Sequence, residues 1–203
     1  MKKPTFRRIL AFIIDMMIVS IISSAIASIG FINPTLDKYN EAYDSYTEYL
    51  QNGLDTKNVS NILNSEEYKD ITYNINYYGR YGTIITLVVT VIYFVVFQYF
   101  TNGYTGGKKL LNIKIESEDG KLKVHQLLLR SLIINNVLTT TLALIALFVL
   151  SKGTFAKVGN YIDVLEMGLV FASFALVLYR QDGKGLHDLL AKTKVVLVNK
   201  TKE

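Results

Sequence analysis

Three long stretches of this sequence contain no charged residue, and they limit what the chain can fold into. They run from 16 to 36, from 81 to 107 and from 131 to 151. At about 1.5 Å of rise per residue, a helix over any one of them would cross the roughly 30 Å hydrocarbon core of a bilayer. Half of the residues are apolar, and their concentration in these runs leaves little for a soluble core. We therefore expect a helical protein that crosses the membrane several times.

The predicted fold is an all-α membrane protein, one domain over residues 1–203 with a four-transmembrane-helix bundle. The spans are expected at residues 9–32, 82–100, 131–150 and 158–179. The fourth is the least clear, because its uncharged run, 167–179, is about 20 Å long and too short to cross alone. An earlier start places Asp163 and Glu166 at the outer interface, as a solvated helix end. The alternative for the first span is a cleaved signal peptide, but Asp15 interrupts the apolar run that a signal needs.

The first connection, residues 33–80, is predicted to be an acidic insertion outside the cytoplasm. It holds eight acidic and four basic residues. Its tyrosines recur at steps of four, three and three, so a helix from about Thr35 to Asn52 would carry them on one face. These tyrosines are Tyr39, Tyr43, Tyr46 and Tyr49. Their shared face either packs the helix onto its own domain or the lipid interface, or it forms a docking surface for a peptide or a partner protein.

Two basic segments, the loop 101–130 and the tail 180–203, are predicted to lie in the cytoplasm. In the loop, alternating residues over 113–116 and the Asp-Gly pair at 119–120 indicate a short strand and a turn. In the tail, the β-like run 193–198 could pair with that strand. The cytoplasmic side should therefore carry a short β-hairpin-like element.

The positions of lysine and arginine predict the orientation of the chain. Sixteen of the 22 lie in the N-terminal segment, the loop 101–130 and the tail 180–203. Both termini of this multi-pass cell-membrane protein are therefore expected in the cytoplasm. The expected partners are the lipid bilayer and either a second copy of the chain or another membrane protein. No nucleic-acid partner is expected, because the basic residues flank the apolar runs instead of sharing one face.

Asp15 is the residue that most needs an explanation. An aspartate in a span costs about 2.5–3.5 kcal/mol on insertion scales, so it needs a partner, a water-filled cavity or a proton. Arg8 lies two turns earlier on the same face, but helical side chains lean toward the N-terminus, so Arg8 points away from Asp15. We therefore expect a partner from another helix, and Arg130 at the entrance of the third span is the best available cation. Asp15 is either a functional group or a structural one that fixes helix packing.

Other motifs carry little evidence of chemistry. The run GYTGGKK at 103–109 lacks the spacing of a phosphate-binding loop, so no nucleotide is expected. Its glycines should let the chain turn as it leaves the bilayer, with Lys108 and Lys109 facing lipid headgroups. His187 and Asp188 are adjacent, but without cysteine or a second nearby histidine they predict no metal site. No cofactor is expected, and no motif predicts an enzyme.

Three separated segments resemble the RDD family of bacterial and archaeal membrane proteins, which is named for an arginine and two aspartates. They are FRRILAFIIDMMI, GYTGGKKLLNIKIESEDGKLKVHQLLLRSLI and GLHDLLAKTKVVLV. By this resemblance Arg8 is the arginine, Asp15 the first aspartate and Asp188 the second. The insertion 33–80 has no counterpart in the family pattern, and Thr-Gly-Gly-Lys stands in place of its usual Thr-Leu/Pro-Gly-Lys turn. The resemblance implies a compact helical membrane domain. Transport of unidentified ligands is proposed for the family, and cation/proton antiport for some members.

Two functions follow as hypotheses. The first is a non-catalytic membrane module that binds or regulates a partner protein through its tyrosine face or its basic side. The second is a small-solute or monovalent cation/proton transporter in which Asp15 alternately binds a proton and a cation. The polar site of either is expected at Arg8, Asp15, Arg130, His187 and Asp188.

Overall fold

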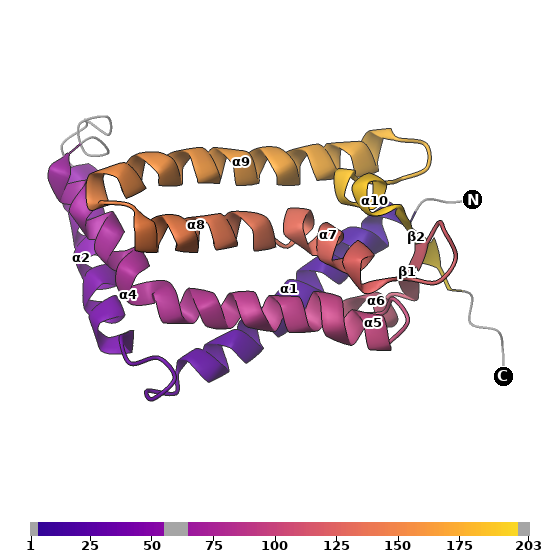
Figure 1. Cartoon of the computed structure of the whole chain (residues 1–203), viewed down its shortest axis with the longest axis horizontal. Helices are drawn as coiled ribbons and strands as arrows, with labels where there is room; N and C mark the ends of the chain where they lie inside the picture. The colour runs from indigo at the N-terminus through magenta and orange to yellow at the C-terminus, as the bar shows by residue number, and fades with distance from the viewer. Residues whose placement is uncertain (1–3, 55–64, 199–203) are drawn as a thin grey trace.

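The computed structural model describes residues 4–54 and 65–198. Figure 1 shows long helices running between two ends of an elongated molecule. Within the described residues three helices are long and apolar enough to cross a membrane. A pair of helices joined at a bend adds a fourth span if the pair is counted as one. The helices are α1 (Thr5–Ala27), α4 (Glu66–Val91) continued by η1 (Ile92–Phe97) and α5 (Gln98–Phe100), and α9 (Lys152–Tyr179). The outward side chains of α9 include Phe171, which is 77% exposed, as expected of a surface in contact with lipid.

The bent pair consists of α7 (Val124–Ile134) and α8 (Val137–Val149), whose axes differ by 68°. We predicted the third span over 131–150, and the structure has two helices there that together are long and apolar enough for one broken span. The helix breaks at Asn135 and Asn136, and Asn136 adopts φ 57°, in the left-handed region. Asparagine tolerates this conformation better than most residues, because its short side chain can form local hydrogen bonds. The break leaves the last carbonyls of α7 and the first N–H groups of α8 without partners in their own helix.

The predicted insertion 33–80 is partly helical. The helix α2 (Leu36–Leu54) lies close to the range that the tyrosine spacing predicts, and it packs on α4. The start of α4 is capped by Ser65, whose hydroxyl accepts the N–H of Tyr68 at 3.0 Å. This helix therefore begins well before residue 82, and the polar end of the insertion extends the second span. The middle of the insertion, 55–64, lies outside the described residues.

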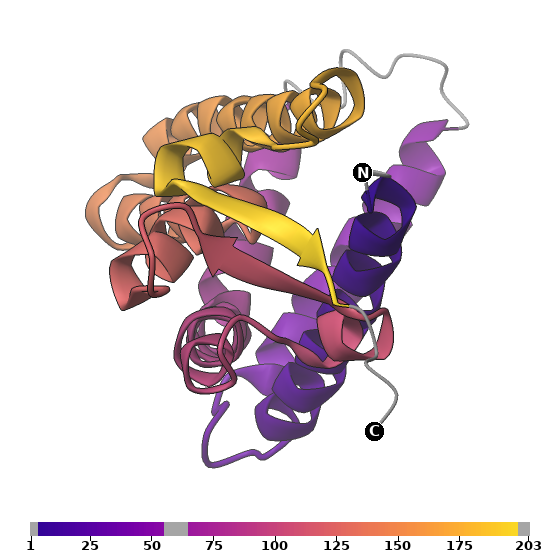
Figure 2. The ribbon, with the colours of Figure 1, turned by 90° about the vertical axis from the view of Figure 1, so that its right-hand side faces the viewer.

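The other end of the molecule carries a small group of elements that we call the sheet cap. It consists of α6 (Gly106–Leu110), β1 (Ile113–Ser117), α10 (Leu186–Ala191) and β2 (Thr193–Leu197). The two strands are antiparallel, with Ile115 opposite Val195, and they lie across the end of the helices in Figure 2. Ile113 and Ile115 are buried, because alternate residues of β1 face the bundle. The predicted two-stranded element is therefore confirmed.

Helix α9 begins at Lys152, before the predicted start of the fourth span at 158. Asp163 and Glu166 were expected at a solvated helix end, and this is wrong, because both lie near the middle of α9. Glu166 is half-buried and accepts hydrogen bonds from Asn136 at 2.8 Å and Thr139 at 2.7 Å. It thus ties α9 to the break between α7 and α8. The negative charge also lies near the start of α8, where the helix dipole favours it.

Candidate functional site

Asp15 is fully buried in α1 and is bound by four groups from outside that helix. The hydroxyl of Tyr93 donates to Oδ1 at 2.8 Å, and the backbone N–H of Gly107 donates to the same oxygen at 2.7 Å. The other oxygen accepts the hydroxyl of Thr105 and lies 3.4 Å from Nζ of Lys108. Both carboxylate oxygens are occupied, so three hydrogen bonds and an ion pair offset the cost of a charge inside the span.

The short helix α6 and Thr105, the residue that caps its start, bring three of these groups to Asp15. A Cβ atom at Gly107 would lie 2.4 Å from the carbonyl oxygen of Ala11 in α1, so only glycine allows this close approach. The glycines of the run 103–109 were predicted to form a turn at the membrane surface, with Lys108 facing lipid headgroups. This prediction is wrong for Gly107 and for Lys108. Lys108 turns inward with its side chain 13% exposed, whereas Lys109 is exposed.

The buried position of Lys108 predicts a pH dependence of stability. Burial lowers the pKa of its ammonium group from 10.5 to about 8, although Asp15 acts in the opposite direction. Between pH 8 and pH 10.5 Lys108 is neutral in the folded protein but carries a proton in the unfolded chain. The contribution of Lys108 to stability is therefore fully present above pH 10.5 and is lost as the pH falls through 8. Between pH 8 and pH 10.5 the free energy of unfolding in detergent should rise relative to that of a Lys108→Met variant, by at most about 3.4 kcal/mol. Parallel pH curves of the two proteins would contradict this.

Asp188, near the start of α10, is the second fully buried carboxylate and is paired with two arginines. Arg8 of α1 and Arg130 of α7 each form an ion pair with it, and the N–H of Gly185 donates to it at 3.0 Å. Burial alone raises the pKa of Asp188, but Arg130, Arg8 and this N–H together hold it well below its usual range. The prediction that Arg130 pairs with Asp15 is wrong, because Arg130 binds the sheet cap instead.

His187 is buried next to these ions and is neutral. Burial lowers its pKa to about 3, and the nearby Arg130 adds to the effect. Nη2 of Arg8 lies 3.3 Å from Nε2 of the ring and can only donate, so Nε2 accepts. The ring proton is therefore on Nδ1, which donates to the hydroxyl of Ser173 at 3.0 Å. His187 thus links α10 to both α1 and α9.

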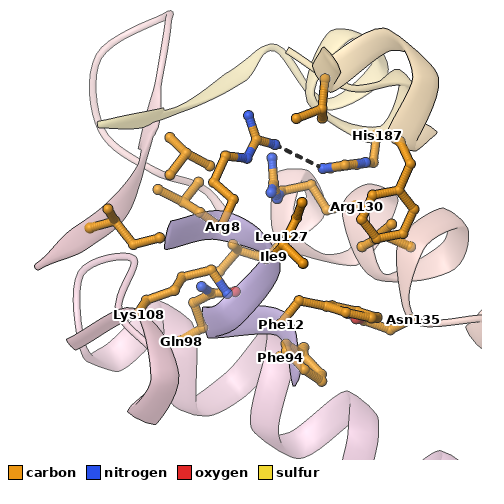
Figure 3. Close-up of a pocket in the computed structure, with 16 residues that line it drawn as sticks. Arg8, Ile9, Phe12, Phe94, Gln98, Lys108, Leu127, Arg130, Asn135 and His187 are labelled. Carbon is orange, nitrogen blue, oxygen red and sulfur yellow. Dashed lines mark hydrogen bonds between the residues drawn. The ribbon is translucent and has the colours of Figure 1, made fainter. Parts of the chain in front are cut away.

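The buried ions border a cavity of about 70 Å³, which we call the cap-side cavity. Arg8, Lys108 and Arg130 line it, while Asp15 and Asp188 lie directly behind them as their partners. Three positive charges against two negative ones leave one positive charge. Figure 3 shows Arg8 and Arg130 next to His187 on one side of the cavity, Phe12 and Phe94 on the opposite side, and Lys108 beside Gln98. The apolar lining includes Ile9, Phe12, Phe94, Leu127 and Phe174.

A second cavity of about 540 Å³ lies between α1, α4 and α8 and reaches toward α2. We call it the α2-side cavity. No charged side chain lines it among the described residues, and hydroxyl and amide groups line much of it. Asn135, at the break between α7 and α8, lines both this cavity and the cap-side cavity. Asn135, in the interruption of the bent pair, is therefore part of the wall of both cavities.

The four tyrosines of α2 mostly serve contacts within the chain. Tyr46 and Tyr49 both pack on the ring of Tyr68 in α4, with centroids 6.3 Å apart in each pair, and the hydroxyl of Tyr49 lies 2.7 Å from that of Ser65. Tyr39 lies directly over Gly79 of α4. Tyr43 is the most exposed of the four, at 52%. These contacts follow the simpler of the two expectations, in which the tyrosine face packs α2 on its own domain.

Several residues of this region were not singled out in the sequence. Tyr93 and Thr105 bind Asp15, and Asn135 and Asn136 form the break. No motif marks these residues, although an Asn-Asn pair inside an apolar run is itself a signal of a helix break. Within residues 4–54 and 65–198 no three histidine, aspartate or glutamate side chains gather in a way that could hold a metal ion.

Together these features define a helical membrane protein whose buried ions join its spans to a cap with a two-stranded sheet. The model of the RDD family matches residues 3–192, nearly the whole chain. The chain therefore belongs to the RDD family. No curated protein and no solved structure matches it. Of the residues named by the family resemblance, Arg8 and Asp188 form an ion pair, whereas Asp15 pairs with Lys108.

Proposed function

We propose that this RDD family protein carries a small solute across the bilayer along a path through the break between α7 and α8. The observation that supports this is the position of Asn135, which lines both the cap-side cavity and the α2-side cavity. If the sheet cap lies in the cytoplasm, as the lysine and arginine distribution predicts, the cap-side cavity lies toward the cytoplasm and the α2-side cavity toward the other side of the membrane. A solute needs only to pass the short segment around Asn135.

The interrupted helix itself favours transport. Breaks inside a span leave backbone groups without helical partners, and membrane proteins tolerate this where the backbone lines a cavity. Transporters commonly place their substrate site at such a break, near the middle of the bilayer. Here Glu166 of α9 and Asn136 stabilise the break through their hydrogen bond, and Asn136 also lines the α2-side cavity.

In this proposal Asp15 and Asp188 are structural groups that hold the sheet cap on the bundle. A proton carrier must release its partners in each cycle, and Asp15 would have to release Tyr93, Thr105, Gly107 and Lys108 together. The alternative function as a partner-binding module relied in part on the tyrosine face of α2. Because most of these rings are used against α4, the geometry favours transport.

Labelling of single cysteines tests the path, since the chain has no cysteine of its own. A small anionic thiol reagent that does not cross lipid, 2-sulfonatoethyl methanethiosulfonate, would be added to one side or the other of oriented vesicles. Ser23→Cys lies in the α2-side cavity and Ile134→Cys in the cap-side cavity, so each should react from its own side only. Asn135→Cys should react from both sides.

The matched control is Ile145→Cys on the outer surface of α8, where the side chain is 54% exposed in an apolar stretch. It should react from neither side, because lipid excludes the ion. If Asn135→Cys reacts from one side only, the two cavities do not form a path and the proposed function is wrong.

A further inference from the structure

Arg8, Arg130 and Asp188 form a cluster of ions at the cap-side cavity, and the charges of this cluster do not balance. Both guanidinium groups pair with the same carboxylate, Arg8 with one oxygen and Arg130 with the other. Lys108 does not change this sum, because Asp15 is its own counter-ion. Arginine cannot lose its proton in a protein. The cluster therefore carries one positive charge in excess.

The excess charge has no counter-ion in the part of the chain that the structure describes. Within residues 4–54 and 65–198, each arginine forms its only ion pair with Asp188. His187, which contacts the cluster, adds no charge because burial lowers its pKa to about 3. Buried charges in proteins are normally paired, since an unpaired one loses the solvation of water without compensation. An anion bound beside the arginines would balance the cluster.

Arg130 has hydrogen-bond donors left for such an anion. Its Nη1 atom donates to Asp188 and, at 2.7 Å, to the hydroxyl of Thr193. Among the described residues no acceptor binds its Nε or Nη2 atom, and neither nitrogen is fully enclosed by the chain. The residue is only 6% exposed and lines the cap-side cavity. One edge of a buried guanidinium group is thus available to a ligand in this cavity.

The cap-side cavity limits the size and the charge of the anion. Its volume of about 70 Å³ is about half the roughly 150 Å³ of a cavity that holds benzene, so it suits an anion of about three or four non-hydrogen atoms. One excess positive charge matches a monovalent anion. Phe12, Phe94 and Phe174 line other parts of the wall, which disfavours a strongly hydrated dianion. The parallel N–H groups on the free edge of Arg130 match two oxygens of a planar oxyanion.

Resting on the proposed transport function, we infer that the cap-side cavity binds a small monovalent oxyanion at Arg130 and that such anions are the solutes that pass Asn135. The rest of the path is compatible with a negative charge. No aspartate or glutamate lines the α2-side cavity among the described residues. Glu166 at the break lines neither cavity, and Asn136 and Thr139 occupy its two oxygens. A cation would instead meet the excess positive charge of the cluster.

The experiment measures nitrate binding to the full chain in detergent by isothermal titration calorimetry. Potassium nitrate replaces potassium gluconate at constant potassium concentration, because gluconate is too large for the cavity. The wild-type protein should bind nitrate at one site. Asn135→Asp adds a carboxylate to the cavity lining and should weaken nitrate binding by about tenfold or more, since it supplies the missing negative charge. The variant should fold, because aspartate has nearly the shape of asparagine and can accept from the hydroxyl of Ser131.

Arg130→Gln is a second variant, which leaves one arginine for one carboxylate. The cluster is then neutral, and nitrate binding should be lost. Lys109→Gln is the matched control, because it removes one positive charge from an exposed position of the sheet cap and should keep the wild-type affinity. Absence of nitrate binding in the wild type would overturn the anion site. Unchanged binding in both Asn135→Asp and Arg130→Gln would overturn it as well.

Nitrate flux separates this inference from the proposed function. Proteoliposomes loaded with potassium nitrate are diluted into gluconate medium with valinomycin, and a nitrate electrode records the release. The wild-type protein should release nitrate faster than protein-free vesicles and faster than Asn135→Asp. Binding without release would keep the anion site but overturn the assignment of anions as the transported solute. The cysteine labelling at Asn135 then decides the proposed function independently of nitrate.

Discussion

Replacing Asp188 with asparagine is expected to destabilise the protein by about 3–5 kcal/mol, because two buried guanidinium groups lose their counter-ion. Asp188 is fully buried and pairs with both Arg8 and Arg130. Asparagine also cannot accept as many hydrogen bonds, so the N–H of Gly185 competes for its single oxygen. Denaturant unfolding in detergent measures the loss, and protease sensitivity of α10 shows whether the sheet cap detaches first.

The matched control is Asp182→Asn, six positions earlier, in the connection that leads from α9 into α10. Asp182 is an exposed carboxylate that pairs with Arg180 at 2.8 Å, and exposed pairs contribute little to stability. A double variant, Asp188→Asn with Arg130→Met, removes one of the unpaired charges. It should be less destabilised than the sum of the two single variants. Equal stability of Asp188→Asn and the wild type would show that this carboxylate does not hold the cap.

The spans were predictable from the sequence because their cause is local. A charge-free run must be helical in lipid, since every backbone group needs a partner within its own segment. The pairing of β1 with β2 was also predictable, because both strands alternate and both lie next to spans that place them at one end. The break at Asn135 and Asn136 was missed, because apolar residues on both sides gave a run long enough for one straight helix.

The partners of the buried carboxylates were harder to predict. Arg130 was predicted as the partner of Asp15 only from its position along its span and from its positive charge. In the structure the partner of Asp15 is determined by the close packing of α6 on α1. Gly107 permits this packing, and the packing turns Lys108 inward. Such an approach is a tertiary contact between segments about ninety residues apart, here joined by the hydrogen bond from Gly107 to Asp15. Nothing in the spacing of charges along one helix encodes it.

The Gly107→Ala variant is expected to lose about 2–5 kcal/mol of stability, a large effect for one methyl group. The added Cβ atom would lie 2.4 Å from the carbonyl oxygen of Ala11 and 3.0 Å from Oδ1 of Asp15. Neither neighbour can retreat easily, because one is helix backbone and the other is held by Tyr93. Helix α6 must move away, which breaks the N–H bond from residue 107 to Asp15. Thermal unfolding in detergent measures the loss.

The same substitution at Gly168 provides the control, because no atom lies within 4 Å of a Cβ built there and the residue is inside α9. Gly168→Ala should leave stability unchanged or raise it by about 0.5–1 kcal/mol, as alanine does inside helices. A second readout separates a specific effect at Asp15 from general loosening. If α6 moves away from α1, Lys108 gains solvent and its pKa returns toward 10.5, so the rise in stability above pH 8 should shrink in Gly107→Ala and persist in Gly168→Ala. Unchanged stability and an unchanged pH curve in Gly107→Ala would mean that α6 does not lie against α1 as described.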